Sequence, residues 1–157
     1  MSSPIPIPSR VNLACEQLDV AIELFFAERS YVASLTLAGA AEEIFGSTLE
    51  GNHRKHTMAL RFEERVRLLG RANLPVPLRN DFIYHQNYPR NAAKHATKKL
   101  GSRSRRVEDQ YFRADPHAAA KSMILCALHN QKLLEIPQSN LGHKFYGWHL
   151  STIYCAE

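Results

Sequence analysis

The sequence is poor in cysteine and has no long apolar run. Its three cysteines, Cys15, Cys126 and Cys155, lie far apart in a chain of 157 residues. An odd number of separated cysteines, with no CxxC pair, forms neither a disulfide framework nor a zinc finger, and it indicates a reducing, intracellular setting. The longest nearly apolar stretch, residues 31–41, is too short to cross a bilayer.

Signals of several targeting and enzyme classes are also missing. Residues 1–8 alternate proline with isoleucine and lack the basic start and apolar run of a signal peptide. The chain has no Gly-rich phosphate loop and no nucleophile elbow. His53 and His56 flank Arg54 and Lys55, whose charges oppose a metal cation. We therefore expect a cytoplasmic protein with no metal, no cofactor and no membrane contact.

Positive charge and histidine are more abundant. The chain has 20 Lys and Arg against 15 Asp and Glu, a formal net charge of +5, and 8 His. A basic balance on a chain long enough for one domain favours nucleic acid, phosphate or an acidic partner. Imidazoles titrate near neutral pH, so the histidines favour acid–base chemistry.

Apolar residues recur at helical spacing, and no segment alternates with the period of a strand. Ser9 and Ser30 stand where N-caps are expected, and Asp115 precedes a proline at the first helical position. The pattern predicts helices over residues 10–28, 31–50, 57–71 and 116–136, and a helical segment over residues 79–100 that Pro89 interrupts.

The fold class that follows is all-α, an up-and-down bundle of four to five helices. Residues 1–9 are expected to form a flexible Pro-rich arm, residues 10–136 the bundle domain, and residues 137–157 a tail that packs on the bundle. The residues expected in the core are Cys15, Leu18, Ile22, Phe25, Leu35, Ala38, Ile44, Met123, Ile124 and Leu128.

One short segment gathers the residues of a phosphodiester site. If Pro89 takes the first position of a helix, Arg90 and Asn91 fall in its first turn, where free N–H groups attract anions. Asn91 and His95 are four residues apart and share a helix face, so the amide can orient the imidazole. A cation stabilises charge on phosphorus while the histidine moves protons.

This Arg-Asn…His spacing resembles the signature of the HEPN superfamily, with four residues between Arg90 and His95. Residues 37–46 also resemble the second helix of small bacterial HEPN-like proteins, and the resemblance covers roughly residues 10–136. It implies a homodimeric, metal-independent endoribonuclease that cleaves single-stranded RNA to 2′,3′-cyclic phosphate and 5′-hydroxyl ends. Arg90, Asn91 and His95 would be its catalytic residues.

The alternative is a non-catalytic dimeric module of the same family that binds a nucleotide, RNA or a protein partner. An interaction protein of a toxin–antitoxin or defence system is a third possibility. For any of these residues, an exposed helix face without function is the competing interpretation.

A second set with the same order, Arg79, Asn80 and His85, competes for the role of the site. The set at 90–95 is preferred because its surroundings are cationic and rich in alanine, whereas Asp81 stands beside Arg79 and Asn80.

Cations continue beyond the motif, and no acid occurs before Glu108. They would contact a phosphate backbone and make binding depend on salt, unless they belong to a solvated loop. These residues are Lys94, Lys98, Lys99, Arg103, Arg105 and Arg106.

Two further features concern the site and the dimer. Glu42 and Glu43 are adjacent, so they point about 100° apart on a helix and cannot act on one atom. One of them can face the cleft and hold Arg90 or its partner, or it is a plain solvated glutamate. The small residues around Gly39 and the aromatic tail at 145–148 are candidates for the dimer seam. The tail alternatively covers the apolar face of its own bundle.

Overall fold

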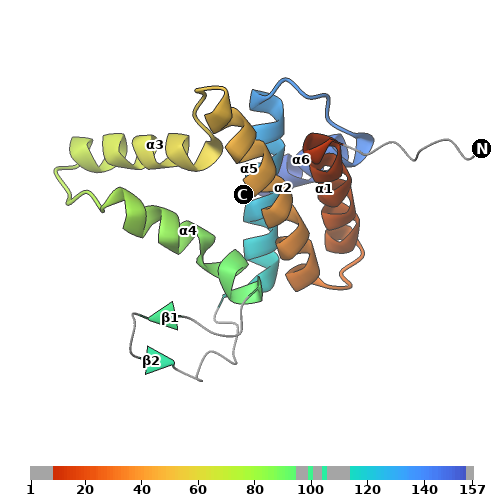
Figure 1. Cartoon of the computed structure of the whole chain (residues 1–157), viewed down its shortest axis with the longest axis horizontal. Helices are drawn as coiled ribbons and strands as arrows, with labels where there is room; N and C mark the ends of the chain where they lie inside the picture. The colour runs from red at the N-terminus through yellow and green to blue at the C-terminus, as the bar shows by residue number, and fades with distance from the viewer. Residues whose placement is uncertain (1–8, 95–98, 101–103, 106–113, 155–157) are drawn as a thin grey trace, which may run out of the picture.

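The computed structural model describes residues 9–94, 99–100, 104–105 and 114–154. Within these ranges the chain is an all-α helical bundle, which confirms the predicted fold class (Figure 1). The sequence pattern assigned no helix to the tail, but residues 140–154 of the tail form the last helix. The helices are α1 (Arg10–Phe26), α2 (Tyr31–Gly51), α3 (Thr57–Arg71), α4 (Arg79–Lys94), α5 (Pro116–Leu133) and α6 (Asn140–Tyr154).

The predicted N-caps begin three of these helices. The Oγ of Ser9 accepts from the N–H of Asn12 at 3.1 Å, and the Oγ of Ser30 accepts from the N–H of Ala33 at 3.2 Å. Asp115 caps α5 directly before Pro116. These side chains satisfy N–H groups that have no partner within the helix, and this fixes where each helix starts.

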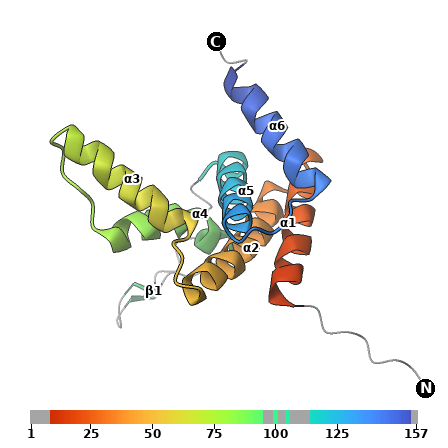
Figure 2. The ribbon, with the colours of Figure 1, turned by 90° about the horizontal axis from the view of Figure 1, so that it is seen from above.

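The core lies where α1, α2 and α5 pack side by side, with α2 in the middle (Figures 1 and 2). Eight of the ten residues expected in the core are buried, and Cys15 and Ile44 are half-buried at its edge. The spacing of apolar residues therefore predicted the inward faces of these three helices.

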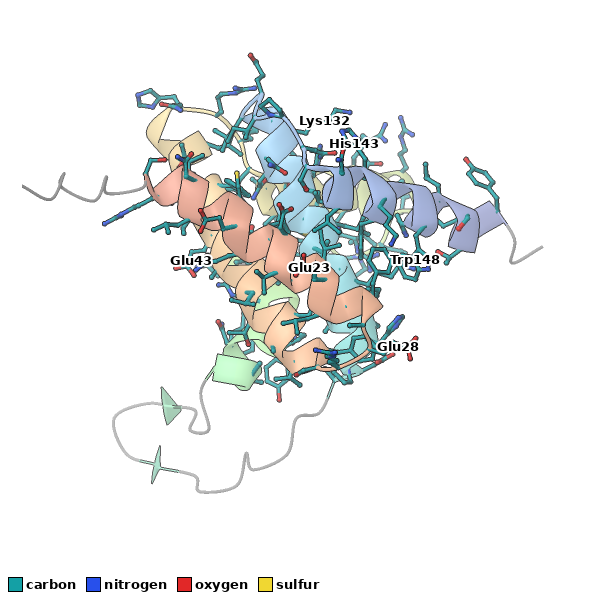
Figure 3. All side chains as sticks on the ribbon, turned by 90° about the vertical axis from the view of Figure 1, so that its right-hand side faces the viewer. Glu23, Glu28, Glu43, Lys132, His143 and Trp148 are labelled. Atoms are coloured by element: carbon teal, nitrogen blue, oxygen red, sulfur yellow. The ribbon has the colours of Figure 1, made fainter. Side chains whose placement is uncertain are left out.

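The C-terminal helix α6 covers one end of α1 (Figure 3). The ring of Phe145 is fully buried, 5.3 Å from that of Phe25, and the ring of Trp148 lies 5.2 Å from Phe25. The aromatic tail thus packs on its own bundle, which is the alternative that the sequence left open, and the buried ring of Phe145 is not accessible to a second copy.

The pair α3 and α4, here called the α3–α4 hairpin (residues 57–94), projects from one side of the bundle (Figures 1 and 2). Within α3 only its first three residues, 57–59, are buried. The rings of Phe62 and Phe82 lie 5.5 Å apart and pack the two helices together. The hairpin is therefore attached to the bundle only at its base.

The prediction that a helix begins at Pro89 is wrong. Pro89 lies inside α4, so Arg90 and Asn91 are not in a first turn and their N–H groups form no anion site there. An internal proline costs one backbone hydrogen bond. The next residue, Arg90, donates a hydrogen bond to α2. The helix also ends before residue 99, because Lys99–Leu100 (β1) pairs antiparallel with Ser104–Arg105 (β2).

Replacing Phe25 tests the packing of the bundle. Phe25 is buried against α6, so Phe25→Ala should lower the free energy of unfolding by about 3–5 kcal/mol. Val20→Ala on the exposed face of the same helix should change it by less than about 0.5 kcal/mol. Denaturant unfolding followed by circular dichroism measures both, and equal effects would contradict the assigned helix phase.

Candidate functional site

The side chain of Arg90 turns from α4 onto α2 and is only 12% exposed. Its Nη1 donates to the carbonyl oxygen of Gly39 and to Oε2 of Glu42, both at 3.3 Å, and lies 3.6 Å from Oε2 of Glu43. The expectation that one of these two glutamates holds Arg90 is confirmed. Both contact it, Glu42 from a buried position and Glu43 from the outer surface of α2 (Figure 3).

Gly39 makes this close approach possible. A Cβ at this position would lie 2.3 Å from Cδ of Arg90, which is too short for a contact between nonbonded carbons. The small residue predicted to serve a dimer seam therefore accommodates a side chain of the same chain. The proposal of a seam at Gly39 is wrong because Arg90 already occupies that surface.

A buried polar network continues from Glu42 into α5 and α3. Nδ2 of Asn130 lies 3.3 Å from both the carbonyl oxygen and Oε1 of Glu42. Oδ1 of Asn130 accepts from the N–H of Thr57 at 2.7 Å and from its hydroxyl at 2.6 Å. His56, the N-cap residue of α3, makes no capping bond, so Asn130 satisfies the first N–H of this helix instead.

Burial raises the pKa of the Glu42 carboxyl above its ordinary value, and the nearby charges of Arg90 and His56 oppose this shift. The guanidinium of Arg90 therefore faces a carboxylate that takes up a proton more readily than an exposed glutamate does. When Glu42 is protonated, Glu43 at 3.6 Å remains to compensate the charge of Arg90.

A pocket of about 160 Å³ lies between α2, the start of α3 and residues 83–90 of α4. Glu42, Glu43, Glu50, His56 and Arg90 contribute the charged and titratable groups of its lining. Nε2 of His56 lies 3.1 Å from Oε1 of Glu50. Carboxylates outnumber cations here, although the chain as a whole is basic.

Three polar atoms around this pocket are buried and have no hydrogen-bond partner among the described residues. They are Nδ1 of His56, Oδ1 of Asn87 and Nε of Arg90. Unsatisfied buried polar atoms are rare in folded proteins and often mark a functional region. This cluster identifies the α2–α4 contact as the candidate site.

The structure places only part of the predicted catalytic set. Arg90 lies in the pocket, Asn91 is exposed on α4, and His95 lies outside the described residues. Of the predicted phosphate contacts, Lys94 ends α4, Lys99 lies in β1 and Arg105 in β2. Lys98, Arg103 and Arg106 lie outside the described residues.

The competing set does not reach the pocket. Arg79, Asn80 and His85 are exposed in the first half of α4, whereas Ile83 and Asn87 line the pocket from the same helix. Of the two motifs, the one that contains Arg90 is therefore the one that adjoins the candidate site.

The sequence reasoning missed Asn130 and Thr57, and it considered His56 only as a metal ligand. One signal was available, because Asn130 continues the apolar face of α5 that includes Met123 and Ala127. A polar residue on a buried helix face must find partners, so its position indicated a network. The sequence did not identify those partners.

Metal binding and thiol chemistry have little support in the described part of the chain. No group of three or more His, Cys, Asp or Glu side chains there could hold a metal ion. Burial raises the pKa of the Cys126 thiol to about 11, which disfavours the reactive thiolate. None of the described helices has both the length and the apolar composition needed to cross a membrane.

A pair of substitutions tests the Gly39–Arg90 contact. Gly39→Ala should lower the free energy of unfolding by about 1–3 kcal/mol because the new methyl group displaces Arg90. The same change made together with Arg90→Ala should add no further loss. The control is Gly147→Ala, since nothing lies within 4 Å of its added Cβ; it should stabilise α6 by about 0.5–1 kcal/mol. An equal penalty with and without Arg90 would disprove the contact.

The raised pKa of Glu42 should make the stability of the folded state depend on pH. The folded state binds the proton more tightly than the unfolded chain, whose pKa stays near 4.5. The contribution of Glu42 to stability is therefore most favourable below pH 4.5, and it is lost as pH rises through the folded pKa. Across this pH range, the free energy of unfolding should decrease less with rising pH for Glu42→Gln than for the wild type. Denaturant unfolding at a series of pH values measures both.

An exposed glutamate of α1 supplies the control, because Glu23→Gln removes the same charge from the surface. This variant should keep the pH trend of the wild type. Parallel trends for the wild type and Glu42→Gln would show that Glu42 has no raised pKa.

The chain shows no significant similarity to any protein-family model, curated protein or solved structure. The geometry around Arg90 therefore carries the functional interpretation by itself.

Proposed function

We propose that this chain is a HEPN-like, metal-independent endoribonuclease that cleaves single-stranded RNA and acts as a homodimer. The motif of Arg90, Asn91 and His95 supports the proposal, together with the position of Arg90 beside a pocket. The products would be 2′,3′-cyclic phosphate and 5′-hydroxyl ends, because the 2′-hydroxyl of the RNA itself attacks the phosphorus.

The observation that carries the proposal is the fixed orientation of Arg90. Its Nη1 is held by Glu42 and the carbonyl of Gly39, while Nε has no hydrogen-bond partner among the described residues. An arginine has five N–H donors, so two anchoring contacts leave others for a phosphate. A cation that is oriented before the substrate binds stabilises the transition state without reorganisation.

The chemistry divides among the three motif residues. His95 removes the proton from the 2′-hydroxyl or delivers one to the leaving 5′-oxygen. Arg90 stabilises the charge on the pentacoordinate phosphorus, and Asn91 orients the imidazole. One imidazole must serve as base and acid in turn, and a homodimer doubles the set because its symmetry repeats every residue.

One observation favours the alternative, a non-catalytic module that binds RNA, a nucleotide or a protein. Glu42 and Glu43 both contact Nη1 of Arg90, so the charge of the guanidinium is already compensated. A phosphate would compete with these carboxylates, and binding would be weaker than at an uncompensated arginine.

Cleavage of a labelled single-stranded RNA in EDTA tests the proposed function. The wild type should produce 2′,3′-cyclic phosphate ends, and His95→Ala should lower the rate by about 10²–10⁴-fold because proton transfer is lost. His85→Ala, an exposed histidine on the same helix and in the competing motif, should retain the activity of the wild type.

Two results would contradict this proposal. One is the absence of cleavage by the wild type, in which case retained RNA binding in a fluorescence-anisotropy titration would support the non-catalytic module. The other is equal loss of cleavage in His85→Ala and His95→Ala, which would leave the two motifs indistinguishable as the catalytic site.

A further inference from the structure

The far end of the α3–α4 hairpin exposes apolar side chains. We call residues 71–79 the tip, and within it Leu74, Val76 and Leu78 are exposed, Leu78 by 73%. Leu68 and Tyr84, on the adjoining turns of α3 and α4, are exposed as well. Scattered apolar residues are common on protein surfaces, but a continuous group on a projecting element marks an interaction site.

Two arginines flank these apolar residues. Arg71 ends α3 and Arg79 begins α4, and both are exposed. Neither forms an ion pair with a carboxylate of the described residues. The tip therefore presents an apolar centre between two positive charges.

The base of the same hairpin has the complementary character. Glu43 and Glu50 stand at the rim of the pocket with side chains 62% and 61% exposed, and Met58 and Ile83 supply apolar lining. Tip and base thus pair positive with negative charge and apolar with apolar surface. Such complementarity guides association and fixes register.

The length of the hairpin fits a pairing of these two ends. The 15 residues of α3 span about 22 Å. When two hairpins lie side by side in antiparallel orientation, the tip of each reaches the base of the other. A two-fold axis then makes both contacts identical, as an isologous dimer requires.

We propose that the α3–α4 hairpins of two copies pair in antiparallel orientation, so that the tip of each docks at the acidic pocket rim of its partner. The occupant is a second copy because both halves of the contact, basic apolar tip and acidic rim, occur on one chain.

The expected size of the contact indicates its strength. A hairpin face about 22 Å long and two helix diameters wide has an area of roughly 450 Å² per copy, or about 900 Å² in total. Specific interfaces begin near about 1,000 Å², so this contact belongs to the weak, transient end of that range. The dimer should therefore depend on protein concentration.

This proposal gives the homodimer of the proposed function a surface, and it does not depend on catalysis. It also places the contact on the hairpin, away from Gly39 and the aromatic tail. A dimer without ribonuclease activity would leave it intact. An active monomer would overturn the hairpin pairing and the homodimer, but it would leave the catalytic roles of the motif residues standing.

The first experiment measures mass by light scattering after size exclusion, at about 5–200 µM protein. The wild type should shift from monomer to dimer across this range. Leu74→Asp with Leu78→Asp should weaken the dimer by about tenfold or more, because each tip then brings buried charge to an apolar contact. Both residues are exposed, so the fold should not change.

A matched control lies on α6. Leu150→Asp with Ile153→Asp alters two leucine-sized residues that are 48% and 51% exposed, close to the 55% of Leu74. This variant should dimerise as the wild type does. A wild type that stays monomeric at the highest concentration, or equal weakening in both double variants, would overturn the proposal.

A charge exchange tests the pairing of tip with base. In Arg71→Glu with Arg79→Glu the tip becomes acidic, and in Glu43→Lys with Glu50→Lys the rim becomes basic. Either variant alone should remain monomeric because tip and rim then repel each other. A 1:1 mixture should form a heterodimer, since both of its tip–rim contacts join opposite charges. Dimerisation of either variant alone, or no dimer in the mixture, would exclude the antiparallel arrangement.

Discussion

The buried carboxylate of Glu42 holds the site together. One oxygen receives the guanidinium of Arg90 from α4 and the other receives the amide of Asn130 from α5. Asn130 in turn binds the first N–H of α3 at Thr57. A single residue of α2 is thereby linked to three other helices. Removing one partner of a buried ion pair costs about 3–5 kcal/mol, because it leaves an uncompensated charge.

This arrangement explains why the hairpin projects as it does. Its two helices are tied to the bundle at Thr57 and Arg90, both close to its base, and the Phe62–Phe82 contact joins them to each other. Nothing in the bundle covers the tip, so the apolar residues there remain at the surface. Elements anchored only at one end have low local stability and are well placed to engage a partner.

The charges of the chain are distributed unevenly over its surface. The net charge of +5 favours an anionic partner, yet the pocket beside Arg90 is rimmed by glutamates. In the proposed ribonuclease, phosphate must therefore compete with Glu42 and Glu43 for the guanidinium. Burial raises the pKa of the Glu42 carboxyl, and Arg90 opposes this shift because its charge favours the carboxylate.

The sequence by itself determined the helices α1, α2, α3 and α5, the N-caps of α1, α2 and α5, and the buried faces of these three helices. These features depend on residues three and four positions apart, which the spacing of apolar and capping side chains reveals directly. It also indicated Arg90 and the adjacent glutamates as partners. Only the tertiary structure decided that α4 continues through Pro89, that Gly39 accommodates Arg90, and that Asn130 completes the network. The contacts of Glu42 with Arg90 and Asn130 join residues 48 and 88 positions apart, so they depend on how the helices pack and not on local pattern.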